Sequence, residues 1–192
     1  MKLPSSSSIV MLVCGIALLY ISMVIAGINF FGLKGYYFII QPLYSFSTVL
    51  YFTELALMSY VLYLTNDPIR AISYFVYTGI GIINTIAFTI FANNVFLFQV
   101  LGVLNMVCLF NIVVQSFLIK NIHLSTPYRI FTLSLAGVIG VKMMVPYLAQ
   151  ALFLPMNDIG RISSITDLIS SGFMLYVVIK IYFLHRLEAK AG

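Results

Sequence analysis

The stretch SIVMLVCGIALLYISMVIAGINFF, residues 8–31, contains no charged side chain and no proline. A helix that crosses the hydrocarbon core of a bilayer needs roughly 20 mostly apolar residues. The stretch therefore predicts a transmembrane helix near the N-terminus. It is longer than the hydrophobic region of a secretory signal peptide, and no small-x-small cleavage motif closes it cleanly. We interpret it as a retained helix rather than a cleaved leader.

Five further apolar segments of similar length follow, separated by short polar breaks. Only 8% of the residues are charged and 62% are hydrophobic, whereas an ordinary soluble domain is roughly 25% charged. Lipid is therefore the expected solvent for most of the surface, and the bilayer is the first expected partner. The predicted fold class is all-α, a single membrane domain over residues 1–192, with transmembrane helices at 8–31, 38–64, 68–92, 95–119, 128–153 and 162–185.

The breaks between the segments contain residues that end and start helices. Asp67 is predicted to be an N-cap, with Pro68 at the first helical position. Residues 123–127 repeat this pattern, with Ser125 or Thr126 as the cap. The repeated cap, proline and arginine are compatible with three stacked hairpins, although any helix that starts on the cytoplasmic side favours the same residues. The other breaks are predicted at residues 32–35, 93–94 and 155–160.

The basic residues divide unequally between the two sides of the predicted bundle. Lys34 and Arg161 fall on one side, and Lys142 falls within a span. Loops that stay in the cytoplasm carry an excess of lysine and arginine, so we expect both termini in the cytoplasm and the protein in the cell membrane. The basic residues on the side of the termini are Lys2, Arg70, Lys120, Arg129, Lys180, Arg186 and Lys190.

Polar and small side chains gather on one face of several predicted helices, at about 100° of rotation per residue. Two interpretations stay open. Such faces pack helices together through bonds of roughly 0.6 kcal/mol each, or they line a cavity, which we expect near Asp167 at the outer end of the last helix. The faces comprise Tyr44, Ser47, Tyr51, Glu54 and Met58; Tyr74, Tyr77, Thr78, Gly81, Asn84, Thr85 and Thr89; Asn105, Cys108, Asn111 and Gln115; and Ser163, Ser164, Asp167, Ser170 and Ser171.

Glu54 and Lys142 are the ionisable residues that the predicted spans place deepest in the membrane. Lys142 lies midway between Arg129 and Pro155, about 19 Å along the helix from either, too far for its side chain to reach water. One unpaired charge at this depth costs roughly 2.5–3.5 kcal/mol. We therefore predict a buried Glu54–Lys142 ion pair. Pro146 adds an irregularity beside it, because proline cannot donate a hydrogen bond to the carbonyl of Lys142.

Two functional hypotheses follow from these features. The first is a translocation or small-ligand- or ion-binding bundle centred on the predicted pair, which would respond to a proton or a substrate. The alternative is a non-catalytic scaffold or accessory subunit, in which the pair is a structural link and aromatic faces bind a larger membrane complex or a second copy of the chain. The candidate ligand-binding residues are Glu54, Lys142, Asp167, Asn84, Asn111 and Gln115.

Several other classes of function lack their sequence signals. There is no H-E-x-x-H, G-x-S-x-G or phosphate-binding glycine loop, so we expect no catalytic residues and no enzyme. Cys14 and Cys108 stand alone in apolar runs, and His123 and His185 lie at the predicted cytoplasmic edge. We therefore expect no metal, haem or other cofactor. The scattered basic residues form no face that would bind nucleic acid.

Overall fold

The computed structural model describes residues 5–91, 94–151 and 156–191. In these residues the regular structure is helical throughout. Six helices are long and apolar enough to cross a membrane, which confirms the predicted all-α transmembrane bundle. The elements are α1 (Ser5–Phe31), the short 3-10 helix η1 (Lys34–Tyr36), α2 (Tyr37–Leu64), α3 (Pro68–Ile90), α4 (Val95–Phe117), α5 (Ile122–Ala151) and α6 (Met156–Ala191).

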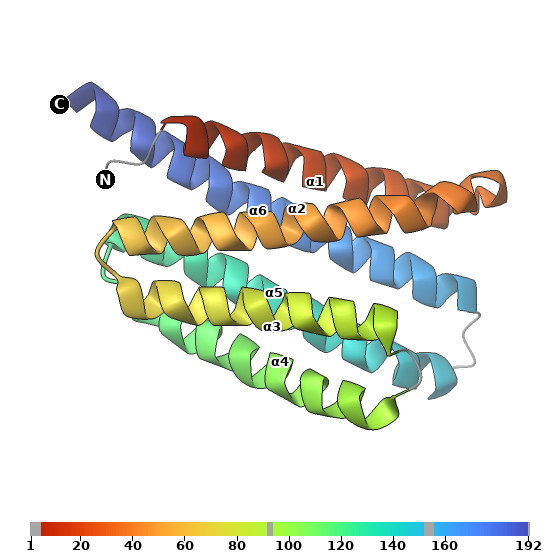
Figure 1. The fold of residues 1–192 in the computed structure, drawn as a ribbon. Helices are drawn as coiled ribbons and strands as arrows, with labels where there is room; N and C mark the ends of the chain where they lie inside the picture. Colours follow the sequence, from red (N-terminus) through yellow and green to blue (C-terminus); the bar gives the residue numbers. More distant parts are fainter. Residues whose placement is uncertain (1–4, 92–93, 152–155, 192) are drawn as a thin grey trace.

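The six helices run up and down in sequence order and close into a ring (Figure 1). Each helix packs against the next one along the chain, and α6 also packs against α1. The start of α1 and the end of α6 lie at the same end of the bundle, which we call the terminal end (Figure 1). The other end is the opposite end. Which of the two faces the cytoplasm stays a prediction.

Two of the predicted breaks end their helices with a left-handed residue. Gly32 has a φ of +63° after α1, and Asn66 has a φ of +59° after α2. The N–H of Leu33 donates to the carbonyl of Ile28 at 3.1 Å, the long-range bond of a Schellman motif. Glycine enters this region freely and asparagine tolerates it, so these residue types stop the two helices where they stand.

The predicted start of the fifth helix is wrong. Residues 123–127 are not a break, because α5 begins at Ile122 instead of residue 128. The side-chain oxygen of Asn121 accepts the N–H of His123 at 3.0 Å and caps the helix, the role predicted for Ser125 or Thr126. Pro127 is the sixth residue of α5, past the four N-terminal N–H groups that lack an intrahelical partner, so it leaves the carbonyl of His123 without an α-helical hydrogen bond.

The boundaries of three other helices also differ from the prediction. α6 extends over Met156–Ala191 rather than 162–185, so residues 156–160 open a helix instead of forming a loop. Asn94 caps α4 by accepting the N–H of Leu97 at 3.0 Å. Asn93 and Pro155, predicted to lie in breaks, and residues 152–153, assigned to the fifth span, lie outside the described residues. Residues 91 and 118–119, assigned to the third and fourth spans, follow the ends of α3 and α4.

Asp67 occupies the predicted N-cap position of α3, with Pro68 after it, but its side chain makes no capping bond. Its carboxylate instead pairs with the guanidinium of Arg70 at 3.2 Å. It also accepts the backbone N–H of Lys120 at 3.1 Å. Asp67 therefore ties the α2–α3 loop to the α4–α5 loop at the terminal end.

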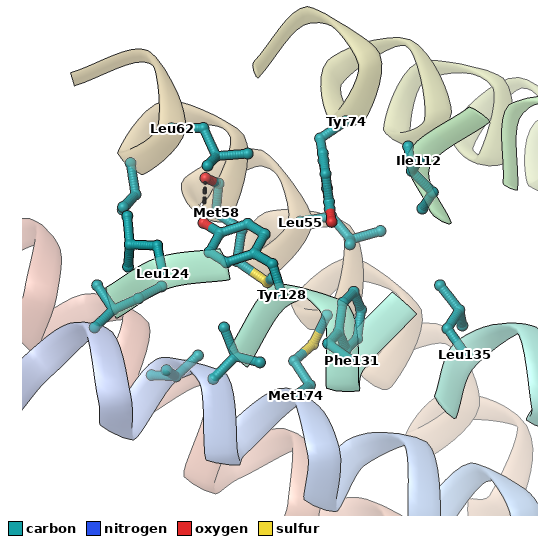
Figure 2. Close-up of a cluster of buried hydrophobic side chains, with 14 of the residues drawn as sticks. Leu55, Met58, Leu62, Tyr74, Ile112, Leu124, Tyr128, Phe131, Leu135 and Met174 are labelled. Carbon is teal, nitrogen blue, oxygen red and sulfur yellow. Dashed lines mark hydrogen bonds between the residues drawn. The ribbon is translucent and has the colours of Figure 1, made fainter. Parts of the chain in front are cut away.

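Buried apolar side chains from all six helices meet in the half of the bundle nearer the terminal end. Figure 2 shows the centre of this cluster, where the hydroxyl of Tyr128 donates to the carbonyl of Met58 at 2.7 Å. The rings of Tyr74 and Tyr128 pack edge to face, with centroids 5.4 Å apart. We define the packed layer as six of these residues, each at most 1% exposed: Leu55, Met58, Tyr74, Tyr128, Phe131 and Met174.

Candidate ligand cavity

A cavity of about 380 Å³ lies between the helices in the half nearer the opposite end. Ligand pockets in proteins span roughly 300–1,000 Å³, so the volume suits a small molecule. All six helices contribute side chains to its wall. Its polar lining consists of Ser22, Tyr44, Ser47, Thr48, Tyr51, Tyr77, Asn84, Thr85, Asn105, Lys142, Ser164, Asp167, Ser170 and Ser171.

The packed layer closes the cavity on the side of the terminal end. On α3 the lining reaches Tyr77, and Tyr74, one turn closer to the terminal end, belongs to the packed layer. On α6 the lining ends at Ser171, and Met174 follows in the layer. The same change from polar wall to apolar packing occurs between Tyr51 and Leu55 on α2. On α5 the lining reaches Leu135, which is itself apolar, and Phe131 follows in the layer.

Lys142 and Asp167 form an ion pair on the cavity wall, between α5 and α6. The predicted Glu54–Lys142 pair is therefore wrong. Because α5 begins at Ile122, Lys142 lies about 30 Å along the helix from that start and only about 14 Å from its other end. This position brings it to the depth of Asp167 on the neighbouring helix. The two side chains are 35% and 33% exposed, so a ligand in the cavity can reach both.

Glu54 occupies a different place, beside the packed layer and outside the cavity lining. Its side chain is fully buried, and neither carboxyl oxygen has a hydrogen-bond partner among the described residues. It faces α1, where a Cβ built on Gly15 would lie 3.6 Å from Glu54 Oε1. A carboxyl in apolar surroundings without a counter-charge is far more stable in its neutral form than as a carboxylate.

The other predicted ligand-binding residues divide between the cavity and the rest of the bundle. Asn84 lines the cavity. Asn111 is exposed on the outer surface of α4, and Gln115 lies outside the lining with its carbonyl oxygen buried and unpartnered. On this helix only Asn105 reaches the cavity. The polar face predicted for α4 therefore includes residues, such as Asn111 and Gln115, that do not line the cavity.

Some polar residues form hydrogen bonds that hold neighbouring helices together. The hydroxyls of Ser22 and Ser171 are 2.7 Å apart, and the amide of Asn29 donates to Ser164 at 2.6 Å. These bonds join α1 to α6 and close the ring. Ser22, Ser164 and Ser171 also line the cavity. Packing and cavity lining, the two interpretations of the polar faces, are therefore combined in the same residues.

Thr48 and Ser22 belong to the cavity wall but were not part of the predicted polar faces. Thr48 donates its hydroxyl to the carbonyl of Tyr44 at 2.8 Å, inside α2. Because this bond satisfies the hydroxyl within its own helix, the residue could face either lipid or the interior. Whether Thr48 lines the cavity therefore depends on where the neighbouring helices lie. Ser22 and Ala26 have the small-x-x-x-small spacing that is typical of packed membrane helices, and this spacing does not by itself indicate a cavity.

The described residues contain no group of three or more His, Cys, Asp or Glu side chains placed to hold a metal ion. Cys14 and Cys108 are free thiols on different helices. The cavity therefore offers one cation, one anion, amides and hydroxyls as its recognition chemistry. The chain matches no family model, no curated protein sequence and no solved structure.

Proposed function

We propose that this multipass membrane protein binds a small polar solute in the cavity between its six helices and carries it across the membrane. The observation that supports this proposal best is a polar cavity with an ion pair on its wall inside an otherwise apolar bundle. Lys142 and Asp167 are the charged members of the lining, and their charges cancel. A solute without net charge, either neutral or zwitterionic, complements such a wall best.

The position of the cavity favours a carrier over an open channel. The lining is confined to the half nearer the opposite end, and the packed layer lies between it and the terminal end. A solute could enter from one side only in this state. Release on the other side requires the packed layer to open. If the termini are cytoplasmic, the cavity faces the outside of the cell membrane.

Thermal unfolding of the purified protein in detergent tests the proposal. The probes are a panel of small solutes: amino acids, polyols, sugars and nucleosides, with acetate and ammonium as singly charged controls. A solute that binds only the folded protein stabilises it by about 2.7 kcal/mol at 100 times its Kd. We expect at least one uncharged or zwitterionic solute to raise the Tm of the wild type, and Asp167→Asn to lose that rise. Asn111→Ala is the matched control and should keep it.

Two outcomes would contradict this proposal. In one, no solute in the panel changes the Tm. In the other, a solute does change it, but Asp167→Asn and Asn84→Ala respond like the wild type, which would place the binding site elsewhere.

A second candidate function is that of a membrane subunit that assembles with another helix, and the exposure of Asn111 favours it. The side chain lies on the outer surface of α4 within a predicted span. An amide that faces lipid alone leaves its hydrogen-bonding groups unsatisfied. Across a helix interface, a second asparagine would satisfy them. Disulfide formation by Val107→Cys in the membrane, lost with Asn111→Leu, would support a pair of identical chains.

A further inference from the structure

The buried carboxyl of Glu54 is not used by the proposed binding site. It lies one turn closer to the terminal end than Tyr51, the cavity-lining residue above it on α2. It is 0% exposed, and both of its oxygens lack a hydrogen-bond partner among the described residues. The ion pair on the wall leaves Glu54 without Lys142 as a counter-charge. A structural carboxylate would normally be paired or hydrogen-bonded at this depth.

The groups around Glu54 cannot neutralise a negative charge. From α1 it meets the backbone of Gly15, which offers a dipole but no charge, and the uncharged thiol of Cys14 is on the adjacent residue of that helix. From α5 the titratable neighbour is Tyr128, whose hydroxyl is already committed to the carbonyl of Met58. From α3 the packed layer contributes the phenol of Tyr74, and from α6 it contributes only the apolar Met174. None of these neighbours carries a positive charge.

Opening of the packed layer would change the surroundings of this carboxyl. In the closed layer the neutral acid is strongly favoured, because a lone carboxylate would be buried in apolar packing. Once the layer parts toward the terminal end, water reaches the group and stabilises the carboxylate. The closed and open states then differ by one bound proton.

We propose that Glu54 is a proton-binding site that is loaded while the packed layer is closed and discharged when the layer opens toward the terminal end. On opening, the carboxyl O–H bond breaks, the proton passes to water on that side, and the carboxylate remains. On closing, the carboxylate takes up a proton again. This inference rests on the proposed carrier function and extends it, because each return to the closed state requires a proton.

Infrared spectroscopy of the purified protein tests the loaded state directly. A protonated carboxyl has a carbonyl stretching band separate from the bands of a carboxylate and of the peptide backbone. The chain has five acidic side chains, so the band can be assigned by substitution. At pH 7 we expect the band in the wild type and in Asp167→Asn, and its loss in Glu54→Gln. A wild-type spectrum without the band would overturn the proposal, whether or not the variant folds.

Thiol labelling tests the discharge step. Met58→Cys places a thiol in the packed layer, in a background in which Cys14 and Cys108 are replaced by alanine. The rate of labelling by a water-soluble maleimide is measured against pH with Glu54 and with Glu54→Gln. The intrinsic pH dependence of the thiol is common to both proteins and cancels in the ratio of the two rates.

We expect this ratio to rise with pH, by at most tenfold per pH unit, because opening releases one proton. A ratio that stays constant while the infrared band is present would mean that Glu54 is a static buried acid, and would overturn the proposal. Solute-dependent changes in the Tm of Glu54→Gln distinguish a failure of the proton-site proposal from a failure of the solute-binding proposal. If they match the wild type, the binding cavity stands even when the proton site fails.

Discussion

Lys142 and Asp167 face each other across the contact between α5 and α6, at a depth where neither is fully buried. An exposed ion pair contributes about 0–1 kcal/mol to stability, and breaking a buried pair costs about 3–5 kcal/mol. Because about a third of each side chain is exposed, we expect the contribution of this pair to stability to lie between these two limits. The physical cost arises mainly from the orphaned charge that remains when one partner is removed.

A double-mutant cycle measures this coupling. We expect Asp167→Ala to lower the free energy of unfolding in detergent by about 1–3 kcal/mol, because it leaves the Lys142 charge uncompensated. The double change Asp167→Ala with Lys142→Met should cost less than the sum of the two single changes.

The matched control is the cycle of Glu54→Ala with Lys142→Met. These residues do not form a pair, so their effects should add. Additive effects for Asp167 and Lys142, with a coupling for Glu54 and Lys142, would contradict the geometry of the cavity wall.

At the scale of elements, α2 and α3 approach each other closely at one glycine. A Cβ built on Gly81 would lie 2.6 Å from Cε1 of Phe52, whereas a Cβ on Gly79 would meet nothing within 4 Å. Gly81 and Phe52 both line the cavity. The absence of a side chain at Gly81 therefore sets the distance between the two helices and the position of the Phe52 ring.

Alanine at these two glycines should have opposite effects. Gly81→Ala forces the Phe52 ring to move, and overpacking of this kind costs about 1–3 kcal/mol. Gly79→Ala should be neutral or stabilising by up to about 1 kcal/mol, since alanine is the better helix former. The measurement is thermal unfolding in the same detergent. Equal effects at both positions would show that α2 and α3 do not pack as described.

The start of α5 is a second feature at the scale of elements, because an earlier start places Lys142 farther along the helix, toward the opposite end of the bundle. Asn121 caps the helix by accepting the N–H of His123. Asn121→Ala should therefore lower stability by about 0.5–2 kcal/mol. Thr126→Ala, at a position that the sequence alone offers as a cap, should have little effect. A larger loss for Thr126→Ala than for Asn121→Ala would support a helix that begins near residue 128.

At the scale of the whole molecule, the ring brings the start of α1 and the end of α6 to one end and places the cavity toward the other. The basic residues give this arrangement an expected direction, because most of them lie at the terminal end. With the termini in the cytoplasm, the cavity would take up its solute from outside the cell and the packed layer would be the inner barrier.

Thiol accessibility in intact cells tests this direction. The native thiols at Cys14 and Cys108 are first replaced by alanine. An impermeant maleimide added outside should label Leu33→Cys in the loop after α1. It should not label Asn66→Cys or His123→Cys at the terminal end until the cells are permeabilised. The reverse labelling pattern would place the termini outside and turn the proposed direction of uptake around.

The sequence by itself determined that the chain forms six helices that are long and apolar enough to cross a membrane. Long uncharged runs such as residues 8–31 leave no alternative to a lipid environment. Residue types such as Gly32 and Asn66 mark helix ends by local backbone chemistry, which does not depend on the rest of the fold. The polar faces of α2, α3 and α6 could also be predicted, because the turn of a helix fixes which side chains share a face.

Only the tertiary structure decided which of these residues meet. Asp167 displaced Glu54 as the partner of Lys142, because α6 lies beside α5 in the ring and α5 begins before residue 128. Asn111 faces outward, whereas Asn105 on the same helix reaches the cavity. The rotation and depth of one helix relative to another depend on how it packs against all of its neighbours. The residue pattern of a single helix carries no information about that packing.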